Sequence, residues 1–213
     1  MTKFILTRHG QTVFNLQRRM QGQGNSDLTE LGIAQAQALG IRLKDIDFDF
    51  VVSSNQGRAM DTTKILVGNK KTPVEFCSDI TEINIGDWSG MSFLEAEEKF
   101  PEQTDNFWHH PADFVPPMGG ETYEQVRERA ANKLKSIAKE HPHSTVLVVS
   151  HGIVIKSLLS FFRNQPISTI ADAQPHPQSC CYCEVAYEDG VWNIYKWNDI
   201  DHYKFINPAL QAK

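Results

Sequence analysis

Four segments of the sequence carry residue types that together could transfer a phosphoryl group. They are Arg8-His9-Gly10, Arg58, Glu82 and His151-Gly152. Guanidinium groups are planar, permanent cations that match the oxygens of a phosphate. A neutral imidazole is a good nucleophile toward phosphorus, and a carboxyl group can move the proton of a departing alcohol. These residue types therefore indicate chemistry on a phosphomonoester.

Each of these side chains has a distinct use in such a reaction. His9 is the candidate nucleophile, and the adjacent charges of Arg8 and Arg58 disfavour its protonated form while they hold the substrate. His151 can donate a hydrogen bond to a phosphoryl oxygen as charge develops there. Glu82 can protonate the leaving alkoxide and then deprotonate the attacking water. This scheme requires no metal ion and no other cofactor.

The elements that must position these residues alternate between strands and helices along the chain. The apolar patterning predicts strands at 4–7, 48–53, 74–77 and 145–150, helices at 29–43, 57–67, 122–140 and 152–162, and a hairpin at 181–197. This order predicts an α/β fold, a three-layer α/β/α sandwich whose mostly parallel sheet ends in an antiparallel C-terminal strand. Ligands bind beyond the carboxyl ends of such strands, where all four segments fall. In the helix at 29–43 the expected inward face is Leu31, Ala34, Ala38 and Ile41.

Residues 78–120 interrupt this alternation with many prolines and glycines. Ser92-x-x-Glu95 resembles a capping box for a short helix that ends near Phe100, and a second short helix is expected over 102–108. We interpret 78–120 as a cap over one end of the sheet, within a single domain of residues 1–213. If the cap overhangs the site, some of its side chains must face the leaving group and form a roomy, apolar pocket. The candidates are Phe14, Met91, Phe107, Trp108, His109 and Met118.

The composition limits the classes of partner. The net charge is -5, and 40% of the residues are hydrophobic, so nucleic-acid binding is not indicated. The first apolar run is too short for a signal peptide, and no run approaches the roughly 18 apolar residues of a membrane span. Three of the four cysteines lie at Cys180, Cys181 and Cys183, which favours reduced thiols. We expect a cytoplasmic monomer or homodimer with a small-molecule substrate and no membrane partner.

The order and spacing of six motifs make the chain similar to a known family. They are LTRHGQTVFN at 6–15, DLTELG at 27–32, SSNQGRAMDT at 53–62, EINIGDWSG at 82–90, GGETYEQVRER at 119–129 and VLVVSHG at 146–152. Together they cover nearly all of the chain and resemble the histidine phosphatase superfamily, which is also called phosphoglycerate-mutase-like. One departure from the family pattern is Asn55-Gln56-Gly57, where an Asp or a Leu usually stands between the serines and the arginine.

The resemblance implies a role for each matching residue. It implies that His9 is phosphorylated transiently, that Glu82 is the proton donor, and that Arg8, Arg58, His151 and Gly152 bind the phosphate. It also implies that Asn15 and Gln21 contact phosphate, although Gln17 and Gln23 are alternatives to Gln21.

Two other functions compete with phosphomonoester hydrolysis. A phosphoglycerate mutase must retain a second anionic molecule, yet residues 82–120 contain a single Lys or Arg, Lys99, among many acidic residues. Water is therefore the favoured phosphoryl acceptor, as in the broad-specificity phosphatase branch of the family. A catalytically silent phospho-ligand binding module is disfavoured because His9 and Glu82 are both present.

The other histidines are given no catalytic role. They are His109, His110, His141, His143, His176 and His202. Most are expected at the surface, and His109-His110 is the exception because this pair lies in the cap.

Overall fold

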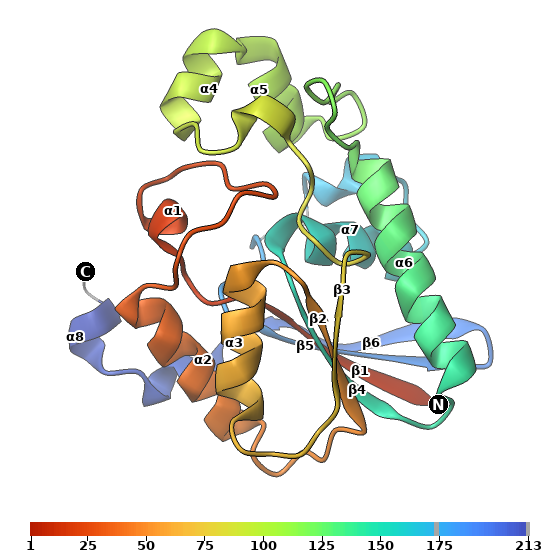
Figure 1. Ribbon diagram of the computed structural model, residues 1–213. Coiled ribbons are helices and arrows are strands. Elements are labelled where there is room, and N and C mark those ends of the chain that lie inside the picture. Colours follow the sequence, from red (N-terminus) through yellow and green to blue (C-terminus); the bar gives the residue numbers. More distant parts are fainter. Residues whose placement is uncertain (173–174, 212–213) are drawn as a thin grey trace.

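A six-stranded mixed sheet forms the centre of the molecule (Figure 1). The computed structural model describes residues 1–172 and 175–211. The strands are β1 (Thr2–Arg8), β2 (Phe50–Ser54), β3 (Val74–Cys77), β4 (Thr145–Ser150), β5 (Tyr182–Glu188) and β6 (Val191–Asp199). Their order is β3-β2-β4-β1-β5-β6, with parallel pairing from β3 to β1 and antiparallel pairing of β5 with β1 and of β6 with β5. The predicted parallel sheet with an antiparallel C-terminal hairpin is confirmed.

Helices cover both faces of the sheet. The helices α2 (Glu30–Arg42) and α3 (Gly57–Val67) pack on one face, and α6 (Tyr123–Glu140) and α7 (Gly152–Phe162) pack on the other (Figure 1). Shorter helices are α1 (Val13–Leu16), α4 (Phe93–Lys99), α5 (Pro101–His109) and α8 (Pro208–Gln211), with 3-10 turns at Gly86–Trp88, Ile167–Ile170 and Asp201–Phe205. The expected α/β/α layers are present.

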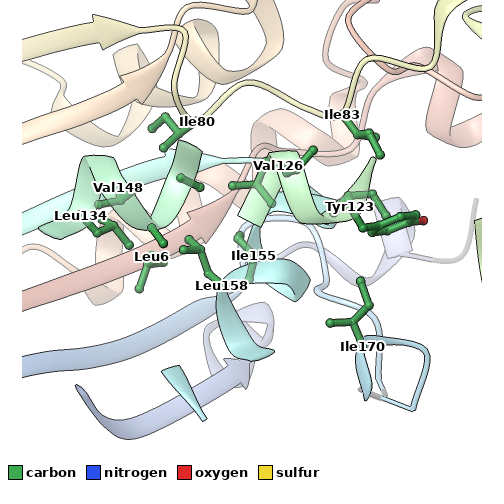
Figure 2. Packing of buried hydrophobic residues seen from close by; sticks show 14 of the residues in the cluster. Leu6, Ile80, Ile83, Tyr123, Val126, Leu134, Val148, Ile155, Leu158 and Ile170 are labelled. Atoms are coloured by element: carbon green, nitrogen blue, oxygen red, sulfur yellow. The ribbon is translucent and has the colours of Figure 1, made fainter. Parts of the chain in front are cut away.

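The two faces of the strands bury two separate cores. On one face Leu6 and Val148 pack with Leu134 of α6 and with Ile155 and Leu158 of α7 (Figure 2). On the other face Ile5, Val51, Leu147 and Val149 pack with α2 and α3. Successive strand residues thus point to opposite apolar layers, which explains why the central strands are apolar without alternation.

The expected inward face of α2 is right for Ala38, which is buried, but wrong for Ile41. Ile41 is 48% exposed, whereas Gln35, Ala36 and Leu39 are buried. Gly32 lets this helix approach the backbone of Gln11 closely. This close backbone packing, more than the hydrophobicity of the side chains, decides which face of the helix is buried. A pattern of apolar residues alone does not reveal that preference.

The segment 78–120 is hydrogen-bonded to the loop that follows β1. Ser92 and Glu95 form the predicted capping box of α4. The Met20 N–H donates to the Met91 carbonyl at 2.8 Å, and the Gly90 N–H donates to the Met20 carbonyl at 2.8 Å. The helices α4 and α5 lie at the top of Figure 1, beyond the loop that carries α1. Among the described residues, no helix is both long and apolar enough to cross a membrane.

Two glycines of α2 provide a matched test of this close packing. A Cβ on Gly32 would lie 2.0 Å from the Gln11 carbonyl oxygen, whereas a Cβ on Gly40 would meet nothing within 4 Å. Gly32→Ala is expected to lower the free energy of unfolding by roughly 2 kcal/mol or more, because the obstructing atoms are backbone. Gly40→Ala is expected to raise it by up to about 1 kcal/mol through helix propensity. Urea denaturation measures both, and equal effects would contradict the close approach.

Candidate active site

The carboxyl ends of β1 and β4 place the two candidate imidazoles side by side. The His9 N–H donates to the Ser150 carbonyl at 3.0 Å, which continues the pairing of Arg8 with Ser150. The rings of His9 and His151 are 5.2 Å apart between centroids, at an angle of 58°. The strand-end argument therefore holds for this pair.

His9 is held as a neutral base. Its Nδ1 lies 2.7 Å from the Gly10 carbonyl oxygen, which can only accept, so Nδ1 carries the proton. Arg58 Nε donates to His9 Nε2 at 3.1 Å, so Nε2 carries the lone pair. Burial, then Arg58 and Arg8, hold the pKa of His9 well below its usual range. The imidazole presents an unprotonated nitrogen beside two cations, as a nucleophile for a phosphoryl group requires.

Arg58 is a cation that is almost fully removed from water. Its side chain is 1% exposed, and burial lowers its pKa to about 10, so the group is still charged at neutral pH. Its Nη1 donates to the Gly24 carbonyl at 2.7 Å and its Nη2 to the Gly22 carbonyl at 2.8 Å. The backbone of the loop after β1 thus holds the guanidinium against His9.

Arg8 is the second cation that acts on His9. Its Nη1 donates to the Pro177 carbonyl at 2.9 Å, while its buried Nε has no hydrogen-bond partner. Burial lowers the pKa of Arg8, and Glu82 opposes that shift. An unpaired buried donor on a guanidinium costs free energy unless a ligand satisfies it.

Two backbone amides orient the carboxylate of Glu82. Its Oε1 accepts from the Ile83 N–H at 3.0 Å, and its Oε2 accepts from the Ile153 N–H in the first turn of α7 at 3.3 Å. The Glu82 N–H donates to Gln56 Oε1 at 2.9 Å. Gln56 lies in the segment Asn55-Gln56-Gly57 that departs from the family pattern, and it also donates to the Gly22 carbonyl at 3.3 Å. Gln56 therefore links Glu82 to the loop after β1, whose carbonyl oxygens bind Arg58.

Ser54 fixes the second imidazole. Ser54 Oγ lies 2.7 Å from His151 Nε2 and accepts from the Gln56 N–H at 3.2 Å. The hydroxyl can donate its single proton to His151 Nε2, and in that tautomer the proton of the ring is on Nδ1. That nitrogen is buried without a partner, and burial followed by Arg58 holds the pKa of His151 well below its usual range. His151 is 0% exposed.

The structure selects Gln21 from the three possible glutamines. Gln21 lines the same cavity as Asn15, whereas the exposed Gln23 donates to the Glu82 carbonyl oxygen and Gln17 accepts from Arg19. Gln21 Nε2 donates to Thr12 Oγ1 at 2.8 Å. Asn15 Oδ1 accepts from Thr12, so its amide nitrogen is left for the cavity.

A cavity of about 370 Å³ is lined by most of these groups, but not by His151 or Gly152. Its polar lining includes His9, Arg8, Arg58, Glu82, Asn15 and Gln21, and its apolar lining is Met20, Ile83, Ile85, Phe93, Phe107, Trp108 and Ile153. Two of the proposed leaving-group residues, Phe107 and Trp108, are thus in the wall. Met118 is 94% exposed, and His109 is also exposed, so neither lines the cavity, and neither do Phe14 and Met91.

Sequence reasoning missed two basic residues of the cavity, Arg19 and His176. Arg19 Nη1 donates to the Gly90 carbonyl at 2.7 Å. Two histidines depart from the expected surface position. His176 is half-buried, and His202 is fully buried. Neither histidine lies at the end of a predicted strand, so no local pattern marks them.

Comparison with known proteins identifies the family. A model described as "Histidine phosphatase superfamily (branch 1)" matches residues 4–200. The chain belongs to this superfamily. It is therefore an enzyme of the histidine phosphatase type, and its fold is phosphoglycerate-mutase-like, as the six motifs predicted.

Three relatives illustrate the range of the superfamily. The metal-independent phosphoserine phosphatase of Arabidopsis thaliana is 33% identical over 209 residues, covering 97% of this chain and 85% of that protein. Phosphoglycerate mutase-like protein 4 of Arabidopsis thaliana is 29% identical over 202 residues, covering 94% and 86%. The structure of Bacillus stearothermophilus YhfR is 33% identical, with a TM-score of 0.91 over 95% of this chain and 99% of that one.

The buried imidazoles predict a stability loss in weak acid. Burial, then Arg8 and Lys156, lower the pKa of His176 to about 3, whereas in the unfolded chain a histidine titrates near about 6.5. Below that pH the unfolded state binds a proton that the folded state does not. The free energy of unfolding therefore decreases as the pH is lowered below about 6.5, by about 1.4 kcal/mol per pH unit for each such histidine.

Urea denaturation at about pH 7.5 and about pH 5.5 measures this loss. His176→Gln is expected to reduce the drop by about 1.4 kcal/mol. The matched control, His109→Gln, changes an exposed histidine and is expected to leave the drop unchanged. An unchanged drop in His176→Gln would show that this imidazole is protonated in the folded protein.

Proposed function

We propose that the enzyme hydrolyses phosphomonoesters in two steps through a phosphohistidine on His9. The observation that carries this proposal is the state of His9 itself. Its Nδ1 proton is engaged by the Gly10 carbonyl, and its Nε2 lone pair accepts from Arg58, whose N–H can turn to a phosphoryl oxygen, in a cavity that also contains a carboxylate. A tautomer fixed in this way directs one defined nitrogen at phosphorus.

The phosphoryl group is bound by Arg8, Arg58, His151 and the first turn of α7. The unpartnered Nε of Arg8 and Nδ1 of His151 supply two buried donors. The N-terminus of α7, at Gly152, adds the positive end of an 11-residue helix. Asn15 and Gln21 contribute amide groups from the loop after β1. Charge that develops on the phosphoryl oxygens during transfer is stabilised by these donors.

Glu82 transfers the proton in both steps. In the first step, His9 Nε2 forms a bond to phosphorus, the bond from phosphorus to the ester oxygen breaks, and protonated Glu82 gives its proton to that oxygen. In the second step, Glu82 takes a proton from water, the water oxygen bonds to phosphorus, and the bond from phosphorus to His9 breaks. Inorganic phosphate leaves, and Glu82 is protonated again.

The chain works as a single domain of residues 1–213 in which residues 78–120 are the cap. The cap contributes Phe93, Phe107 and Trp108 to the cavity wall, together with Ile83 and Ile85. The leaving group therefore contacts an apolar surface of considerable size. This composition favours water as the phosphoryl acceptor, because it provides little to retain a second anionic substrate.

Phosphoglycerate mutation is the alternative that one observation favours. The Arg19 guanidinium lines the cavity and comes from the loop after β1, outside residues 82–120. It could hold the carboxylate of a phosphoglycerate. Incubation with 3-phosphoglycerate separates the two functions, because hydrolysis releases inorganic phosphate and mutation produces 2-phosphoglycerate. Release of phosphate from a metabolite library would then identify preferred substrates.

The covalent intermediate can be trapped directly. Quenching with base during turnover is expected to leave phosphate on His9, because phosphohistidine is stable in base and labile in acid. His9→Ala is expected to lose both the phosphoenzyme and at least about 10³-fold in kcat with p-nitrophenyl phosphate. Phosphate on a serine or a cysteine would contradict the mechanism. A wild-type enzyme as inert as His9→Ala would instead support a phospho-ligand binding module.

A leaving-group series tests the role of Glu82. Glu82→Gln removes the transferable proton but keeps the size of the side chain. Its kcat/KM is expected to fall about 10²-fold or more for alkyl phosphates and far less for p-nitrophenyl phosphate, because a good leaving group needs little protonation. Rates measured across alkyl and aryl esters give the dependence on the leaving-group pKa. Equal losses across the series would exclude Glu82 as the acid.

A further inference from the structure

His176 lies in the cavity wall on a segment that is anchored from both sides. Its carbonyl oxygen accepts from Asn198 Nδ2 at 3.2 Å and from Gln178 Nε2 at 3.1 Å. The next carbonyl, of Pro177, accepts from Arg8 Nη1 at 2.9 Å. The backbone of His176 is therefore fixed relative to one of the phosphate-binding arginines and to β6.

The side chain of His176 points to the first turn of α7. Its Nε2 lies 2.7 Å from the position that a Cβ on Gly152 would occupy, and Arg8 Nε lies 3.6 Å from the same point. The Arg8 Nε atom has no hydrogen-bond partner, and the His176 ring forms no hydrogen bond with any other described residue. Two side chains of the cavity wall thus bring polar atoms without a hydrogen-bond partner in the described part of the chain to the N-terminus of α7.

The groups at this place suit an anion. Arg8 Nε and the amides of the α7 N-terminus can only donate, and a neutral imidazole can donate through one nitrogen. The carboxylate of Glu82 engages the Ile153 amide and is not hydrogen-bonded to either Arg8 or His176 in the described part of the chain. Buried donors without acceptors are stabilised by a bound oxyanion.

We infer that His176 is a further phosphate-binding residue, whose Nε2–H donates to a non-bridging oxygen of the bound phosphoryl group. This inference rests on the proposed function, because it adds a contact to the same phosphoryl site. The His176 contact accompanies the one from Arg8 Nε. His176 belongs to the segment before β5, whereas the other proposed phosphate ligands come from other segments. The oxygen contacted is the same in the ester and in inorganic phosphate, so the contact does not depend on the leaving group.

Inorganic phosphate is the probe that tests this contact. Its inhibition constant against p-nitrophenyl phosphate would be measured at neutral pH for the wild type, His176→Leu and His176→Gln. The leucine variant removes the donor and is expected to raise the inhibition constant about tenfold or more, because hydrogen bonds to charged groups contribute about 1.5–3 kcal/mol. The glutamine variant keeps an N–H donor and is expected to stay within about threefold of the wild type.

The control variants are His109→Leu and His109→Gln, which change an exposed histidine of the cap outside the cavity. Both are expected to keep the wild-type inhibition constant. If His176→Leu keeps the wild-type inhibition constant of phosphate, the phosphoryl contact is overturned. This holds whether or not the preference among leaving groups changes. Equal weakening in the leucine and glutamine variants would also overturn it, because the donor would then be irrelevant.

A measurement on the wild type covers the case in which His176→Leu does not fold. The imidazole nitrogen signals of His176 in an NMR spectrum are assigned by their absence in His176→Gln. They are expected to shift on titration with inorganic phosphate, and no shift at saturating phosphate would overturn the inference. A wild-type protein that turns over no phosphomonoester and binds no phosphate would refute the proposed function itself, whatever the variants do.

Discussion

The burial of the Arg58 guanidinium against His9 is the constraint on which the rest of the site depends. A charge removed from water must be matched by hydrogen-bond acceptors, or its burial is prohibitively costly. The Gly22 and Gly24 carbonyl oxygens provide that match. The loop after β1 must therefore turn its backbone inward, and Gly22 does so with a φ of 49°, packed so tightly that a Cβ would lie 2.4 Å from Ile85.

The neighbouring segments follow from this inward loop. Gln56 bridges the Gly22 carbonyl and the Glu82 amide, so the same short stretch that carries Arg58 also places the acid. The cap is hydrogen-bonded to the end of the same loop through Met20 and Met91. Arg58, the carboxylate of Glu82 and the apolar wall are thus parts of one hydrogen-bonded assembly.

The sequence allows prediction of the residues whose position follows from topology. His9 and His151 directly follow parallel strands, and Arg58 and Glu82 occur in the segments after two others, so a strand pattern alone brings their loops to one edge of the sheet. The choice of Gln21 over its neighbours depends on a contact with Thr12 that spacing does not encode. His176 precedes an antiparallel strand in a segment without periodicity, and only the folded chain brings it to Gly152. Ile41 of α2 faces outward, against the prediction, because the close approach of Gly32 to Gln11, not side-chain size, orients that helix.

The carbonyl oxygens that accept from Arg58 also affect what happens after the reaction. A phosphate that enters the cavity competes with the Gly22 and Gly24 carbonyls for the guanidinium protons. The free energy of phosphate binding then includes only the difference between the hydrogen bonds that Arg58 forms with phosphate and those that it gives up with the carbonyls. Arg58 supports His9 without becoming a strong trap for inorganic phosphate. An enzyme that gives its phosphoryl group to water benefits from such a compromise, because each turnover ends only when the product escapes.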